Sequence, residues 1–151
     1  MNVLADVISP EELAVWRSLQ RAQVTIMRRI EAELLDRHDL PLASFEVLQQ
    51  LANAPQRRLR MNDLADRVLL SRSGLTRLVD RLEREGLVER HACTSDARGL
   101  YAVLTAAGSR RLAGATPTYH QCIRECFLDR IGAGELRQVG ATASRLARDL
   151  T

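Results

Sequence analysis

The sequence predicts a mainly α-helical, single-domain protein that carries one small β-hairpin. Long stretches with apolar residues at helical spacing lie toward both ends of the chain, over about 9–38 and 105–150. Between them, over about 42–104, come shorter helical segments and then two β-prone runs. The 151 residues, 46% of them hydrophobic, suffice for one domain with its own core.

The first long helix is expected to begin at Ser9, whose side chain can cap it, with Pro10 at the first helical position. Pro41 should end it, since proline lacks the N–H that a helix needs. With one polar interruption at Gln23, apolar residues recur at helical spacing through Leu13, Trp16, Leu19, Ile26, Ile30 and Leu34.

Two short helices are expected next. The first is Leu42–Leu51, with Phe45 and Leu48 turned inward. After a break at Ala54-Pro55-Gln56, Asn62 is expected to cap a second one over residues 63–68. The buried stripe of this second helix is formed by Leu64, Ala65 and Val68.

A third helix over residues 72–85 has two distinct faces. Ser71 can cap its start, and Gly86 suits the left-handed conformation just past its end. Its apolar face holds Leu75, Leu78, Val79 and Leu82. Its polar face holds Ser73, Thr76, Arg77, Asp80 and Arg84.

The hairpin and two further helices complete the pattern. Residues 87–91 and 100–104 are β-prone runs joined by a polar loop. Thr105 can cap a helix that runs to about Arg130, and a last helix follows. Steps of three and four in that last helix predict a seam of the kind found in coiled coils, formed by Leu136, Val139, Ala143, Leu146 and Leu150.

Positive charge is concentrated where the short elements lie. Residues 57–111 hold 12 arginines and 7 acidic residues, a net charge of +5, whereas residues 1–56 carry a net charge of −3. Two short helices followed by a hairpin is the order of a winged helix-turn-helix, whose second helix enters the DNA major groove. The small hydroxyls and arginines on the polar face of that helix can reach base edges and phosphates. We therefore expect double-stranded DNA as a partner, the alternative being an ordinary solvated helix.

The loop of the hairpin adds two candidates. Arg98 is suited to insert into a narrow minor groove, where negative potential is concentrated. Asp96 is expected to pair with Arg77 and hold the loop and the helix in register. The predicted DNA-binding residues are Ser71, Arg72, Ser73, Thr76, Arg77, Asp96 and Arg98.

Four stretches carry a family resemblance: Leu64-Ala65, the run Leu70 to Val88, Asp96-Ala97-Arg98 and the run Val103 to Gly108. They resemble segments of the MarR family of bacterial regulators. The resemblance implies an obligate homodimer whose end helices form the interface, acting on a pseudo-palindromic operator. It also implies a transcriptional repressor, less often an activator, released by a small ligand or by cysteine oxidation. Ala97 departs from the pattern, since the family commonly has a basic residue there.

The resemblance assigns groove contacts to Ser73, Thr76 and Arg77, and wing contacts to Asp96 and Arg98. It further implies a cleft for a small phenolic or aromatic effector, lined from the first, second and fifth helices. Candidates for that cleft are Trp16, Met27, Phe45, Tyr119 and His120. Methionine and aromatic residues at helical spacing are otherwise plain core residues, and this alternative stays open for each.

The cysteines leave a further alternative open. Cys122 and Cys126 are four residues apart on one helix face, without the additional ligands that a metal site needs. Cys93 lies near Arg90 and His91, which can favour a reactive thiolate. A thiol-based redox-responsive regulator of the same fold, or a DNA-binding protein without ligand response, are therefore the competing interpretations.

Several other classes are not expected. The three histidines lie far apart in the chain and there is no glycine-rich phosphate loop, so catalysis, a metal and a cofactor are not predicted. Neither a secretory signal nor an apolar run of membrane-spanning length is apparent, so we expect a cytoplasmic protein without a membrane partner.

Overall fold

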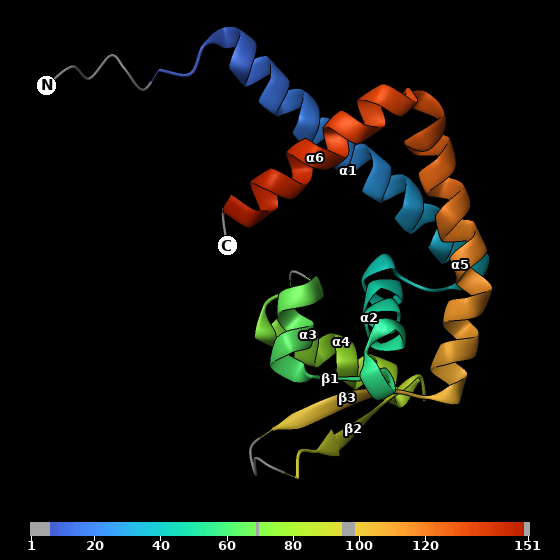
Figure 1. The fold of residues 1–151 in the computed structure, drawn as a ribbon. Helices are drawn as coiled ribbons and strands as arrows, with labels where there is room; N and C mark the ends of the chain where they lie inside the picture. The colour runs from blue at the N-terminus through green and yellow to red at the C-terminus, as the bar shows by residue number, and fades with distance from the viewer. Residues whose placement is uncertain (1–6, 69, 95–98, 150–151) are drawn as a thin grey trace, which may run out of the picture. The chain divides into compact units, whose positions relative to one another are not determined.

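A computed structural model describes residues 7–68, 70–94 and 99–149 (Figure 1). These residues divide into two compact units. Unit 2 runs from Glu33 to His120, and unit 1 comprises the chain up to Ala32 and from Gln121 onward. The mainly α-helical fold with a small antiparallel sheet confirms the predicted fold class.

Helix α1 spans Pro10–His38, so the predicted long first helix is confirmed. Its start is closed by a reciprocal pair of hydrogen bonds. The backbone N–H of Glu12 donates to Ser9 Oγ at 3.2 Å, and the backbone N–H of Ser9 donates to Glu12 Oε2 at 2.8 Å. This arrangement is a capping box, which satisfies N–H groups that have no partner within the helix.

Unit 2 packs three helices around one core: α2 (Leu42–Asn53), α3 (Met61–Val68) and α4 (Arg72–Arg84). The residues predicted to turn inward on these helices are all buried. One predicted cap is wrong: Asn62 is the second residue of α3 and does not precede it. The reason is that a short strand runs directly into the helix and fixes its start at Met61.

The sheet has three strands where the sequence indicated two. Strand β1 (Arg58–Arg60) pairs with β3 (Leu100–Leu104), which also pairs with β2 (Val88–Ala92), so the order is β1-β3-β2 and every pairing is antiparallel. Ala102 lies at the centre, opposite Leu59 on one side and Arg90 on the other. We call the strands β2 and β3 the wing. Figure 1 shows β2 and β3 projecting beyond α2, α3 and α4.

Helix α5 (Ala106–Cys126) begins at the root of the wing. Thr105 Oγ1 accepts from the N–H of Gly108 at 3.0 Å and donates to the carbonyl of Gly86 at 2.7 Å, so the predicted cap also ties α5 to the end of α4. The helix ends at Cys126, before the expected Arg130, and a 3-10 turn η3 (Leu128–Arg130) follows. Helix α6 (Ala133–Asp149) completes the described chain. Among the described residues, no helix is long and apolar enough to span a bilayer.

Candidate nucleic-acid interface

Helix α4, which we call the reading helix, presents the predicted polar face to solvent. Arg72, Ser73, Thr76 and Arg77 are all exposed, and the apolar face of the helix is buried against the rest of unit 2. Because Arg72 and Thr76 are four residues apart, as are Ser73 and Arg77, these residues share one side of the helix. The structure therefore leaves on the surface the side chains that the sequence pointed to.

Ser71 has a structural task at the start of the reading helix. Its Oγ accepts a hydrogen bond from the N–H of Gly74 at 3.1 Å and lies 3.3 Å from Ser73 Oγ. The hydroxyl thus caps the helix, as the sequence predicted. This cap fixes where the reading helix begins, and a direct contact of Ser71 with DNA stays a prediction.

Thr76 lies midway along the exposed face. Its hydroxyl donates to the backbone carbonyl of Arg72 at 2.9 Å. The proton is engaged, so the groups left for a base edge are the lone pairs of the oxygen and the methyl group. These suit a donor amino group of adenine or cytosine, or the methyl of thymine.

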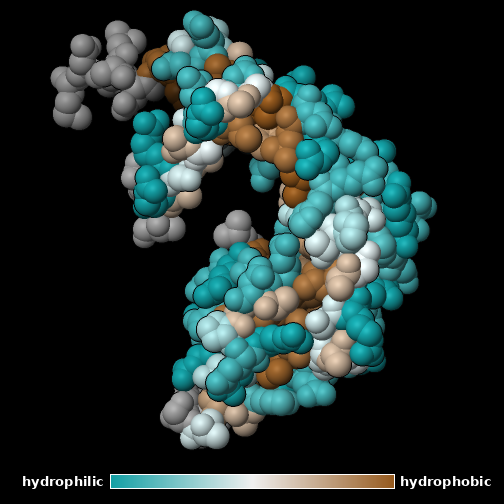
Figure 2. Space-filling model, turned by 45° about the vertical axis from the view of Figure 1, so that its right-hand side comes forward, coloured by the Kyte–Doolittle hydropathy of each residue, from teal (hydrophilic) through white to brown (hydrophobic). Residues whose placement is uncertain are grey.

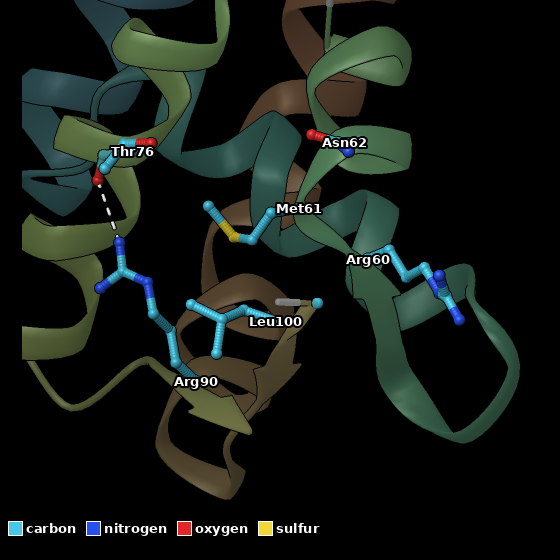
Figure 3. A pocket seen from close by; sticks show the side chains of 7 residues that line it. Arg60, Met61, Asn62, Thr76, Arg90 and Leu100 are labelled. Carbon is cyan, nitrogen blue, oxygen red and sulfur yellow. Dashed lines mark hydrogen bonds between the residues drawn. The ribbon is translucent and has the colours of Figure 1, made fainter. Parts of the chain in front are cut away.

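A hollow of about 360 Å³ lies beside Thr76, at the junction of β1, α3, the reading helix and the wing (Figure 3). Its lining includes Arg60 from β1, Asn62 from the first turn of α3 and Arg90 from β2. Sequence reasoning did not assign these three residues to the site. Arg60 was missed because the strand that carries it is only three residues long. The lining residues are Arg60, Met61, Asn62, Thr76, Arg90, Gly99 and Leu100.

Arg90 makes a dense set of contacts with the reading helix. Its guanidinium forms ion pairs with Asp80 at 2.7 Å and with Glu83 at 2.6 Å. It also donates to the backbone carbonyl of Thr76 at 3.2 Å, the bond drawn in Figure 3. Its backbone N–H donates to the other carboxylate oxygen of Glu83 at 3.2 Å. In the sequence, only the spacing of Asp80 and Glu83, three residues apart on one helix face, indicated a place where such an arginine could bind.

The wing tip lies outside the described residues. Asp96 and Arg98, which the sequence predicted as wing contacts, and the neighbouring Ala97 fall in this segment. The predicted pairing of Asp96 with Arg77 therefore stays a prediction.

The predicted effector residues are distributed over both units. Trp16 and Met27 lie on α1 in unit 1 and are exposed, with Trp16 55% accessible. In unit 2, Phe45 is completely buried and its ring lies 4.4 Å from that of Tyr119. Phe45 is thus a core residue that supports Tyr119, and His120 is exposed beside it.

Tyr119 borders a hollow of about 250 Å³ between α2, α3 and α5. Burial, and secondarily the negative charge of Glu46, raise the pKa of the Tyr119 phenol above its usual 10.0. The phenol is therefore a neutral hydrogen-bonding group at the edge of this hollow. The other lining residues are Glu46, Gln49, Gln50, Arg67 and Val68.

The cysteines are free thiols. Cys93, the candidate for reactivity, is buried and only 5% accessible, which argues against oxidation at that site. Cys122 is buried as well, and Cys126 is half-buried. No group of His, Cys, Asp and Glu able to hold a metal occurs within 7–68, 70–94 and 99–149.

Unit 1 exposes apolar side chains. Leu19 of α1 and the α6 residues Val139, Ala143 and Leu146 line an apolar hollow of about 280 Å³. Leu146 is 48% accessible and Leu136 is also exposed, whereas Leu150 lies outside the described residues. Figure 2 shows hydrophobic surface on the helices of this unit. The described residues of the predicted seam are thus exposed to solvent.

Comparison with known proteins identifies the fold. The structure is similar to that of Sco3205, a MarR family transcriptional regulator from Streptomyces coelicolor solved in complex with DNA, with 32% identity and a TM-score of 0.91 over 96% of this chain and 91% of that chain. AbsC, a MarR family transcriptional regulator from the same organism, has 28% identity and a TM-score of 0.89 over 97% of this chain and 98% of that chain.

Curated relatives match in a shorter region. The homoprotocatechuate degradative operon repressor of Escherichia coli is 36% identical over 75 residues, which are 50% of this chain and 49% of the repressor. This chain thus aligns with about half the length of the curated relatives it matches. All these relatives are regulators, not enzymes. A model of the MarR family matches residues 38–99, and the likeness to Sco3205 extends over nearly all of both chains, so the chain belongs to the MarR family of transcriptional regulators.

Proposed function

We propose that the protein is a homodimeric transcriptional repressor that binds a pseudo-palindromic operator and is released by a small effector. The observation that carries the DNA-binding part is the exposed face of the reading helix, which presents Arg72, Ser73, Thr76 and Arg77 to solvent. The DNA complex of Sco3205, with which this chain shares 32% identity, supports the same role. The proposed location is the cytoplasm, where such DNA is accessible.

Two copies are required for the proposed readout. A two-fold dimer places its reading helices in successive major grooves, roughly 34–36 Å apart. The exposed seam of Leu136, Val139, Ala143 and Leu146 supports a dimer, because a monomer would leave this apolar face in water.

The dimer can be tested by sedimentation. Leu146→Glu places a charge in the seam and should yield a monomer in analytical ultracentrifugation. Arg137→Glu, which changes an exposed α6 residue outside the predicted seam, should remain a dimer. A dimer for Leu146→Glu would refute the seam.

DNA binding is tested with fragments flanking the protein's own gene and with a scrambled fragment across a salt series. We expect tight, salt-sensitive and selective binding by the unmodified protein. Arg98→Ala should weaken binding and reduce the salt slope by about 0.9, because one arginine charge no longer neutralises the DNA in the minor groove. Arg137→Ala is the matched control, and its slope should equal that of the unmodified protein. Equal, weak binding to both fragments would contradict the proposal for that operator.

The base contact is tested separately. Thr76→Ala should relax preference at particular base pairs in a single-base substitution series, because it removes an oxygen acceptor and a methyl group. A uniform loss at every position would instead assign Thr76 to the phosphate backbone.

The hollow beside Tyr119 supports a site for a phenolic or aromatic effector. It lies against α3, which precedes the reading helix, and it combines the Tyr119 phenol with Arg67 and two glutamine amides. The E. coli relative is named a repressor of a homoprotocatechuate degradative operon, which makes hydroxylated aromatic acids the first compounds to screen.

The effector proposal is tested by DNA release and by melting temperature in the presence of such acids. Tyr119→Phe should weaken the response. Tyr101→Phe is the control, because Tyr101 lies on β3 away from this hollow. No release with any acid would favour a regulator without ligand response, and release by oxidant alone would favour the thiol-based alternative.

A further inference from the structure

We infer that Arg90 is a positioning residue that fixes the wing relative to the reading helix, and that DNA selectivity depends on it. The inference rests on the proposed function, since it concerns how the two DNA-contacting elements are held together. Its partners are the carbonyl of Thr76 and the carboxylates of Asp80 and Glu83.

The contacts extend along two turns of the helix. Thr76, Asp80 and Glu83 succeed one another at intervals of four and three residues, so they line one side of the reading helix. A single guanidinium reaches all three, since arginine offers five donors in a planar fork. The side chain of Arg90 is only 18% accessible, so it lies pressed between the wing and the helix.

We call Arg90 with its partners Thr76, Asp80 and Glu83 the clamp. The backbone of Arg90 fixes the clamp to the sheet. Arg90 sits opposite Ala102 in the β2–β3 pairing, and its own backbone N–H is held by Glu83. Glu83 therefore accepts hydrogen bonds from both the backbone and the side chain of Arg90. A shift of the wing along the reading helix would break these bonds together.

Arg90 differs in this respect from an arginine that contacts phosphate. Its charge is already matched by two carboxylates, at 2.6 and 2.7 Å, which leaves little of it for DNA. Removing the two carboxylates leaves Arg90 in place, adds two units of positive charge and cuts the clamp. Electrostatics alone then predicts tighter DNA binding, whereas loss of positioning predicts weaker and less selective binding.

The test compares Asp80→Asn/Glu83→Gln with a matched pair, Glu85→Gln/Glu89→Gln. The matched pair makes the same charge change just past the end of the reading helix and on β2, but involves acids that the structure pairs with Arg81 and His91. Affinity is measured for the operator and for a scrambled fragment, once the unmodified protein has shown selective binding. If the unmodified protein shows no selective binding, that result contradicts the proposed function and does not bear on the role of Arg90.

We expect the clamp variant to lose roughly tenfold in operator affinity, as loss of a charged hydrogen bond would give, and to bind scrambled DNA at least as well as before. Arg90→Met should lose selectivity similarly, and Arg90→Lys should not restore it, since lysine lacks the planar fork. The matched pair should keep its selectivity. Urea unfolding checks that each variant folds, and Glu83→Gln alone serves if the double variant does not. Unchanged selectivity in the folded clamp variant or in Arg90→Met would overturn the inference.

Discussion

Replacing Gly108 with alanine would place a methyl group against the backbone carbonyl of Leu87 and 2.7 Å from Leu104 Cδ1. The carbonyl cannot yield easily. The N–H of Leu87 is bonded to the carbonyl of Leu82 at 2.9 Å, and its own carbonyl accepts from Thr105 at 3.2 Å. Overpacking of this kind costs about 1–3 kcal/mol, and the rigid neighbour places it toward the upper end. Alanine regains about 1 kcal/mol of helix propensity, so the net loss of stability should be about 2 kcal/mol.

Gly114→Ala is the matched control in the same helix. A Cβ at Gly114 meets nothing within 4 Å, so this variant should gain about 1 kcal/mol. Urea unfolding at one fixed protein concentration measures both changes, since the stability of the proposed dimer would depend on concentration. A Gly108→Ala variant as stable as the unmodified protein would refute the reasoning, because the close approach of α5 to Leu87 would then be absent.

Three further predictions concern local interactions. The backbone N–H of Ser9, and secondarily its hydroxyl, lower the pKa of Glu12 below 4.5. The contribution of Glu12 to stability is therefore present above pH 4.5 and is lost as pH falls through the lowered value. In an NMR titration, α1 should fray in acid, and Glu12→Gln should abolish this pH dependence. Because the pKa of Tyr119 is raised, its contribution to the free energy of unfolding is complete below pH 10 and is lost as pH rises through the folded-state value. Phenolate absorbance should show one tyrosine that titrates at higher pH than the other. Tyr119→Phe should remove that late titration. Ser44→Ala removes the acceptor of a 2.7 Å bond from Arg81, whose side chain is 42% accessible to water, so urea unfolding should show a loss of only about 1 kcal/mol; a loss several times larger would mean that water does not replace the hydroxyl.

Local pattern was sufficient for most of the fold. The caps at Ser9, Ser71 and Thr105 were readable because each is a hydroxyl residue placed directly before an amphipathic run. Strand β1 could not be predicted from the sequence, because three residues are too few to show the alternating pattern of a strand. Its pairing partner also lies more than forty residues away in the chain. The wrong cap at Asn62 follows from that omission.

The candidate site was predictable to the extent that it lies on one helix. Spacing alone assigned the exposed face of the reading helix correctly, because the buried face is fixed by apolar residues such as Leu75 and Leu82. Arg90 was missed, since its partners belong to another element and depend on how the wing crosses the helix. Phe45 illustrates the converse: an aromatic residue proposed for a cleft is a core residue because its ring is enclosed on all sides.

The place of β1 in the sheet makes the elements of the proposed DNA interface a closed ring of contacts. The chain leaves β1 at Arg60 and enters α3 at Met61 with no connecting loop. From there α3 packs on the reading helix, the reading helix packs on β2, β2 pairs with β3, and β3 pairs with β1 again. A push on α3 therefore reaches the wing by two routes at once, through the reading helix and through the sheet. A compound that displaces α3 would therefore disturb both proposed DNA-contacting elements, the reading helix and the wing, at the same time.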